Sequence, residues 1–303
     1  MKKLIYLSLL LSTVVVFDSC KKANSEVKGC MDPTSISYNA KATVDDGSCQ
    51  YLASSATEKR NAVLEEYTGV RCTFCPDGHR KAQAFADANP GKVVLINVHT
   101  GSYATPQSGW PDFTTSFGAG LASISGLAGY PAGSMNRNLF PGGASASPYY
   151  KQGASSIAIS RGGFAAAGAE IMKNNSPVNV GFKTEWNEST RELKVIAEAY
   201  FTQDIANGTL LNVALLENNV IGKQIDAGVY NDNYVHKHML RHLLTGQWGD
   251  AIAGADAKTG KRIQKTYTYT VPSSFKIENC EVAVFATQSD KLGIFTGTVK
   301  NAK

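Results

Sequence analysis

The segment CTFC at residues 72–75 has the clearest chemical spacing in this chain. A strand-like run at residues 61–67 precedes it, and a helix-like run at residues 76–89 follows. A cysteine at a helix start meets free backbone N–H groups and the positive end of the helix dipole, which lower the pKa of its thiol. Cys72 is therefore a candidate nucleophile and Cys75 the candidate resolving thiol of a disulfide-exchange centre. The same pair could instead be a purely structural disulfide.

Two further residues have the spacing of a thioredoxin-like site. Glu66 precedes Cys72 on the incoming strand, at the position where thioredoxins keep a buried acid that manages protons for the second cysteine. Pro131 precedes a candidate strand at residues 132–137, as does the proline that faces the cysteine pair in that fold. We therefore expect a thioredoxin-like domain in which Pro131 shapes a peptide-binding face.

Metal chemistry is the competing interpretation of the cysteine pair. A zinc site would need two more ligands, and the sequence has no second CxxC. His79 follows on the same predicted helix, where we expect it to face solvent or cap the helix. The imidazoles of His236, His238 and His242 would suit zinc or copper, but hydrogen bonding within a structural loop is the favoured interpretation.

The periodicity of the first half predicts an α/β arrangement. Residues 61–67 and 92–98 are expected to form parallel strands joined by the helix at 76–89. A second helix is expected within residues 111–124. Residues 147–173 are mostly helical in composition, with an interruption at Gly162-Gly163.

After Pro177 the pattern changes to short runs with β character, which predict an immunoglobulin-like β-sandwich. The runs are residues 178–186, 191–201, 209–219, 262–271, 280–288 and 294–300. Residues 226–257 do not fit a strand and are expected to form a long excursion from the sandwich.

The N-terminus has the composition of a secretion signal. Lys2 and Lys3 precede an apolar run at residues 4–17, which is shorter than the roughly 20 residues of a membrane-spanning helix. We assign residues 1–19 to a signal peptide and expect lipidation of Cys20, with plain secretion as the alternative. Residues 20–28 would then form a lipid-anchored tether.

Residues 29–51, GCMDPTSISYNAKATVDDGSCQY, form a candidate module closed by a disulfide between Cys30 and Cys49. Such a closure would stabilise the module by about 3 kcal/mol. Its oxygen-bearing side chains either begin turns or bind calcium, which selects hard oxygen ligands. These side chains are Asp32, Asn39, Asp45 and Asp46. The module resembles a small cysteine-bracketed repeat found near the ends of many secreted bacterial proteins.

Composition restricts the remaining function classes. The chain has 303 residues, 43% of them hydrophobic and 18% charged, with a formal net charge of +5. The basic residues are scattered, which does not indicate a nucleic-acid partner. Disulfides persist after export, and Cys280, left without a partner, is expected to be a buried apolar residue. The sequence lacks the GxSxG, HExxH and GxxxxGK[ST] motifs of hydrolases and nucleotide-binding proteins.

Three segments together resemble the outer membrane protein 28-related lipoproteins of Gram-negative bacteria. They are EEYTGVRCTFCPDGHR, YPAGSMNR and YVHKHMLRHLLTGQWGD. The resemblance implies a thioredoxin-like domain, here residues 57–175, followed by a β-rich domain, here residues 176–303, and an outer-membrane location. It implies no established reaction.

Two functions therefore remain as expectations. In the first, Cys72 and Cys75 exchange disulfides with an unidentified cell-envelope protein or peptide, and the N-terminal lipid attaches the chain to the outer membrane on its periplasmic face or the cell surface. In the second, the chain is a non-enzymatic binding or adhesion protein in which the CxxC is a structural disulfide.

Overall fold

The structure is a computed structural model that describes residues 26–303. The described residues divide into two compact units, a small one that ends at Cys49 and a larger one, Gln50–Lys303. The expected signal peptide at residues 1–19 and the expected lipidation site at Cys20 lie outside the described residues. No helix among the residues described is long and apolar enough to cross a membrane.

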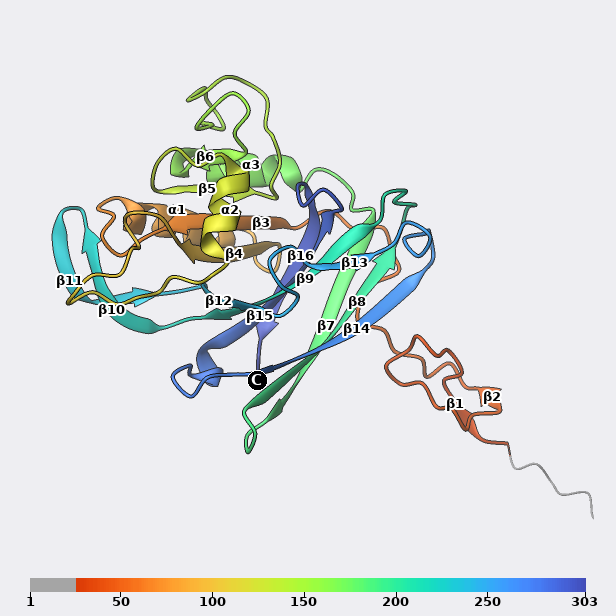
Figure 1. Ribbon diagram of the computed structural model, residues 1–303. Coiled ribbons are helices and arrows are strands. Elements are labelled where there is room, and N and C mark those ends of the chain that lie inside the picture. The colour runs from red at the N-terminus through yellow and green to blue at the C-terminus, as the bar shows by residue number, and fades with distance from the viewer. Residues whose placement is uncertain (1–25) are drawn as a thin grey trace, which may run out of the picture. The chain divides into compact units, whose positions relative to one another are not determined.

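The larger unit is built on one mixed sheet with the strand order β16-β15-β9-β12-β4-β3-β5-β6 (Figure 1). Its strands are β3 (Ala62–Thr68), β4 (Val93–His99), β5 (Ala132–Met135), β6 (Ala158–Ser160), β9 (Thr209–Glu217), β12 (Met239–Leu243), β15 (Cys280–Gln288) and β16 (Ile294–Asn301), and β13 (Asp250–Ile252) also pairs with β9. The sheet is continuous across residues 175/176, where we predicted a domain boundary. That boundary stays a prediction.

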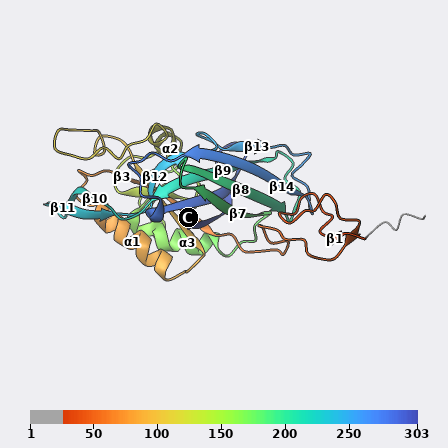
Figure 2. The same ribbon diagram turned by 90° about the horizontal axis from the view of Figure 1, so that it is seen from below.

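Helices cover both faces of the β3–β4 part of this sheet. They are α1 (Cys75–Asp87), α2 (Gly118–Ser125) and α3 (Phe164–Ile171), with short 3-10 turns at Arg161–Gly163 and Ile277–Asn279. Figure 2 shows α1 and α3 on one face and α2 on the other. The alternation of β3 explains this, because Leu64 packs with the α1 and α3 residues while Val63 and Tyr67 pack with Leu121 of α2.

A smaller antiparallel sheet packs on the β9–β15 part and completes a β-sandwich. It has the order β14-β8-β7 and contains β7 (Val178–Asn187), β8 (Glu192–Phe201) and β14 (Arg262–Thr270). Phe182 and Phe201 of this sheet share one buried core with Val213 and Val284 of the large sheet. Burial of each such side chain stabilises the fold by roughly 1.5–3 kcal/mol. The expected β-sandwich is confirmed, and one of its two layers also carries β3 and β4.

Some local predictions were wrong. The segment 226–257, predicted to lack strands, contains β11 (Val229–His236), β12 and β13. β11 pairs with β10 (Val220–Asp226) in a separate hairpin. Residues 147–173 were predicted to be mostly helical, yet the part before Gly162 contains β6. Its small residues suit a helix, but pairing of β6 with β5 overrides that preference.

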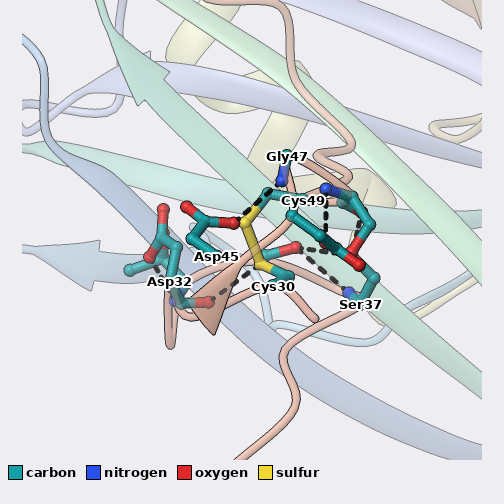
Figure 3. The surroundings of a disulfide bond; sticks show 10 residues. Cys30, Asp32, Ser37, Asp45, Gly47 and Cys49 are labelled. Atoms are coloured by element: carbon teal, nitrogen blue, oxygen red, sulfur yellow. Dashed lines mark hydrogen bonds between the residues drawn. A yellow bond between two sulfur atoms is a disulfide. The ribbon is translucent and has the colours of Figure 1, made fainter. Parts of the chain in front are cut away.

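The small unit contains the predicted cysteine-bracketed module. Its strands are β1 (Lys28–Gly29) and β2 (Val44–Asp45), which pair in parallel. Cys30 and Cys49 form a disulfide with an S–S distance of 2.02 Å, as Figure 3 shows. A unit with so little regular structure depends on this covalent closure.

A buried ion pair fixes β3 against the turn after β5. The Arg137 guanidinium donates two hydrogen bonds to Glu65, at 2.6 and 2.8 Å, and both side chains are at most 2% exposed. Ser134 donates a further hydrogen bond to Glu65. Glu65 and Arg137 therefore form an ion pair with each other in place of hydrogen bonds to water.

We predict that Arg137→Ala lowers the free energy of unfolding by about 3–5 kcal/mol, because it leaves the Glu65 carboxylate buried without its counter-ion. Denaturant unfolding at pH 7 measures the change. Arg80→Ala is the control, since Arg80 pairs with Asp226 at the surface with 58% of its side chain exposed, and its loss should cost less than about 1 kcal/mol. Equal losses in the two variants would contradict the prediction.

Candidate functional site

Cys72 and Cys75 form a disulfide at the N-terminal end of α1. Cys75 is the first residue of the helix, and Pro76 follows it in the first turn, where a missing N–H costs nothing. Cys72 is 3% exposed and Cys75 is fully buried. An attacking thiolate therefore cannot reach either sulfur without local opening.

The β10–β11 hairpin lies against the cysteine loop and contributes to this burial. Ile225 N–H donates to the Val70 carbonyl at 3.0 Å, and Ala227 N–H donates to the Thr73 carbonyl at 3.0 Å. The side-chain amide of Gln224 donates to the Cys72 carbonyl at 3.2 Å. Two main-chain hydrogen bonds and one side-chain hydrogen bond thus hold the loop closed on the hairpin side.

Glu66 and Pro131 converge on Gly78, one helical turn after Cys75. A Cβ added to Gly78 would clash with Glu66 Oε1 and would lie 3.0 Å from Pro131 Cβ. The Tyr130–Pro131 peptide bond is cis. A glycine at position 78 therefore allows the acid and the proline to approach the first turn of α1 together.

Glu66 is completely buried, and neither of its carboxyl oxygens has a hydrogen-bond partner among the described residues. Burial raises the pKa of Glu66 well above its ordinary value. Burial therefore favours the neutral, protonated form of this carboxyl group. This is the state in which a carboxyl group can donate a proton.

His79 does not face solvent or cap the helix, as the sequence had suggested. Its Nε2 lies 2.9 Å from Thr68 Oγ1, and its Nδ1 lies 2.8 Å from Tyr234 Oη. Burial, reinforced by the neighbouring His236 ring, lowers the pKa of His79 to about 3. The prediction failed because helical spacing alone cannot reveal that β11 covers this side of α1.

A group of aromatic rings, missed in the sequence, continues from Tyr234. The ring centroid of His236 lies 4.8 Å from that of Tyr234, 4.7 Å from Phe113 and 5.6 Å from His99. Burial lowers the pKa of His236 to about 4. His79 and His236 are therefore neutral near pH 7. The signal that could have found His99 and His236 is that each is the last residue of a strand, β4 and β11.

The three downstream histidines do not converge. His236 belongs to the buried ring group, His238 Nδ1 lies 3.1 Å from Glu281, and His242 stacks on Tyr269 with centroids 4.2 Å apart. Cys280 is 1% exposed, and burial raises its pKa to about 12. Cys280 thus has the buried, unreactive character that the sequence indicated.

The candidate calcium ligands each begin a turn in the structure. One carboxylate or amide oxygen of each accepts a backbone N–H two residues further on, and Figure 3 shows this for Asp32 and Asp45. The other two are Asn39 and Asp46. Within residues 26–303, no group of three or more His, Cys, Asp or Glu side chains is arranged to hold a metal ion. Calcium binding by these residues stays a prediction.

Comparison with known proteins identifies one family. A profile described as "Outer membrane protein Omp28" matches residues 120–302. No curated protein matches the chain.

Solved structures are similar at low sequence identity. HBP35 of Porphyromonas gingivalis is 22% identical, with a TM-score of 0.61 over 80% of this chain and 76% of that one. A domain of the outer membrane lipoprotein Omp28 from the same organism is 19% identical, with a TM-score of 0.30 over 41% of this chain and 86% of that one. A protein of Agrobacterium tumefaciens is 13% identical, with a TM-score of 0.45 over 82% and 97%. The likeness to HBP35 concerns the fold alone.

We predict that the neutral His236 makes the fold acid-sensitive. Its folded pKa of about 4 lies below the ordinary value of 6.5, so the unfolded chain binds more protons and stability falls as pH drops below about 6.5. Because the unfolded chain binds this proton and the folded chain does not, the free energy of unfolding should fall by roughly 2 kcal/mol from pH 7 to pH 5 through His236 alone. Denaturant unfolding of wild type and His236→Phe at both pH values tests this. An identical loss in the two proteins would refute it.

Proposed function

Because the chain belongs to the Omp28 family of outer membrane proteins, we propose that it is an exported, lipid-anchored protein whose Cys72–Cys75 pair exchanges disulfides with a cell-envelope protein or peptide. The convergence of the cysteine pair, Glu66 and Pro131 around the first turn of α1 carries this proposal. The lipid on Cys20 would attach the chain to the outer membrane.

A thioredoxin-like arrangement of residues 57–175 is part of the proposal. β3 and β4 are parallel and joined through α1, while β5 pairs antiparallel with β3 and β6 with β5. α3 then returns to the α1 face. Pro131 stands immediately before β5, where it would shape a peptide-binding face.

The chemistry starts from the oxidised pair. A partner thiolate attacks Cys72 Sγ, the Cys72–Cys75 bond breaks, and its electron pair goes to Cys75 Sγ, which takes a proton from the Glu66 carboxylic acid. A second partner thiolate then attacks the mixed disulfide and releases Cys72 as a thiolate. The partner dithiol is oxidised and the Cys72–Cys75 disulfide is reduced by the same two electrons. Solvent returns the proton to Glu66.

A second candidate function has its own support. The burial of both sulfurs and the hairpin contacts at Val70, Cys72 and Thr73 suit a structural disulfide. The chain would then be a non-enzymatic binding or adhesion protein, with its contacts made by the β-rich part.

The reduction potential separates the two functions. We expect the Cys72–Cys75 couple to be less negative than about −300 mV, the limit below which structural disulfides typically fall. Equilibration of the purified protein with glutathione and dithiothreitol buffers, read by thiol alkylation, gives the value. Cys75→Ser should also trap a partner as a mixed disulfide on Cys72, and Cys72→Ser should not. A more negative potential and no trapped partner would rule out disulfide exchange.

We predict that Gln224→Ala speeds reduction of the pair. The Gln224 amide donates to the Gly69 and Cys72 carbonyls, and losing hydrogen bonds worth about 1 kcal/mol should raise the rate of reduction by dithiothreitol about fivefold. Asn233→Ala is the control, because Asn233 is an exposed residue of the same hairpin. Equal rates in both variants would show that the hairpin does not limit access to the disulfide.

A further inference from the structure

Three histidines meet where the β10–β11 hairpin packs on the α/β part of the sheet. His79 belongs to α1, His99 is the last residue of β4, and His236 is the last residue of β11. The ring centroids of His99 and His236 lie 5.6 Å apart. Tyr234 of β11 connects His79 to this pair, because its Oη lies 2.8 Å from His79 Nδ1 and its ring centroid lies 4.8 Å from that of His236. The three histidines therefore join the hairpin to α1 and to the end of β4.

The histidine group has no neighbour that would stabilise a positive charge. His99 and His236 are 4% and 2% exposed, and their ring nitrogens have no hydrogen-bond partner among residues 26–303. The ring of His79 contacts the hydroxyl groups of Thr68 and Tyr234, which are uncharged. An imidazolium at any of the three positions would lose its hydration without gaining a counter-ion.

The charged groups around the histidines also disfavour their protonation. Burial is the main cause of the lowered pKa of His79 and of His99, and the cations Arg80 and Arg241 add to it. Lys237, which lines the same cavity as His79, is a further cation. The nearby carboxyl groups are paired or neutral: Asp226 of β10 pairs with Arg80 of α1, Glu217 of β9 with Arg241 of β12, and Glu281 of β15 with His238, while burial favours the protonated form of Glu66 of β3.

Opening of the hairpin is therefore linked to pH. Burial lowers the pKa of His236 to about 4, and the nearby main chain of Gly222 offsets only part of this effect. In an open hairpin the hydrated imidazole regains its ordinary pKa of 6.5, so the open state binds the proton more readily than the closed state. The ratio of open to closed hairpin then rises as the pH falls below 6.5. For His236 alone this rise is about 20-fold from pH 7 to pH 5. His79 and His99 act in the same direction.

The hairpin that carries His236 also covers the disulfide. Around one end of β10, Ile225 and Ala227 donate main-chain hydrogen bonds of 3.0 Å to the cysteine loop. At the other end of β10, Val220 is the register partner of His236. β10 is therefore fixed to the cysteine loop at one end and, through β11, to the histidine group at the other. Protonation of that group weakens the packing that keeps the hairpin over the loop.

We propose that the β10–β11 hairpin is an acid-released cover of the Cys72–Cys75 disulfide, with His79, His99 and His236 as its proton-binding group. Near neutral pH the hairpin is closed and both sulfurs are shielded. As the pH falls, the imidazoles take up protons, the hairpin moves away from the cysteine loop, and a reductant or a thiol reaches the disulfide. The cover controls access alone, so it does not require that the pair exchanges disulfides with a partner.

The test is the rate at which tris(2-carboxyethyl)phosphine reduces the pair in the full-length protein at pH 7 and pH 5, each rate divided by that of oxidised glutathione at the same pH. We expect the normalised rate of wild type to rise by at least about 20-fold from pH 7 to pH 5. His236→Phe and, from the β4 side, His99→Phe should each reduce this rise by at least about fivefold. His242→Phe is the matched control, because His242 stacks on Tyr269, apart from the hairpin, and it should leave the rise within about twofold of wild type. A wild-type rise of less than about fivefold, or one that both folded hairpin-side variants retain in full, would overturn the proposal.

Cys280 distinguishes release of the hairpin from unfolding of the larger unit, because it is 1% exposed in the core of the β-sandwich. After reduction at pH 5, N-ethylmaleimide should label Cys72 and Cys75 and leave Cys280 unlabelled, as peptide mass spectrometry can show. Labelling of Cys280 as fast as Cys72 would mean that the whole unit unfolds, and would refute a local cover.

The cover and the proposed disulfide exchange fail separately. A potential below about −300 mV with no trapped partner would exclude exchange and leave the acid-dependent rate of reduction intact. A rate that does not depend on pH would exclude the cover and leave the potential and the trapped partner unchanged.

Discussion

The pairing of β12 with β4 at Asn97 is the constraint on which the rest of the larger unit depends. Asn97 N–H donates to the His238 carbonyl at 2.7 Å, its side-chain amide donates to the Lys237 carbonyl at 2.8 Å, and Met239 is its register partner. β12 in turn pairs with β9, which leads to β15 and β16. The sandwich layer is thereby an extension of the β3–β4 sheet. The same pairing buries Asn97 Oδ1 without a hydrogen-bond partner among the described residues and brings the end of β11 over α1.

The sequence predicted the elements better than their partners. The β runs after Pro177 and the strand–helix–strand unit around CTFC were correct, because alternation and helical periodicity are local properties of the chain. The β12–β4 pairing was missed, since it joins residues about 140 positions apart and nothing local encodes it. The error over residues 226–257 has the same cause. Their polar composition suits a loop, and only the neighbouring strand and hairpin partner give them strand structure.

Glu65 and Glu66 show why site chemistry could be predicted only in part. The sequence gives two adjacent, identical acids on one strand, and alternation sends them to opposite faces. Glu65 forms an ion pair with Arg137, whereas Glu66 meets no cation and burial raises its pKa. The prediction that Glu66 is buried beside the cysteine helix followed from its spacing. Its lack of a partner follows from Gly78 and Pro131, which are brought against it only by the fold.

The β10–β11 hairpin covers the disulfide at CTFC. It contacts the loop through two main-chain hydrogen bonds, from Ile225 and Ala227, and two from the Gln224 side chain. Each is worth about 0.5–1.5 kcal/mol, so opening costs little compared with unfolding. Beneath the loop lie the N-terminal end of α1 and the Glu66 side chain, which packs against Gly78 of this helix. A buried acid without a hydrogen-bond partner lowers the stability of the fold at neutral pH. A purely structural disulfide does not require such an acid beside it. No hydrogen bond among the described residues offsets that cost, so Glu66 itself does not contribute to the stability of this part of the molecule.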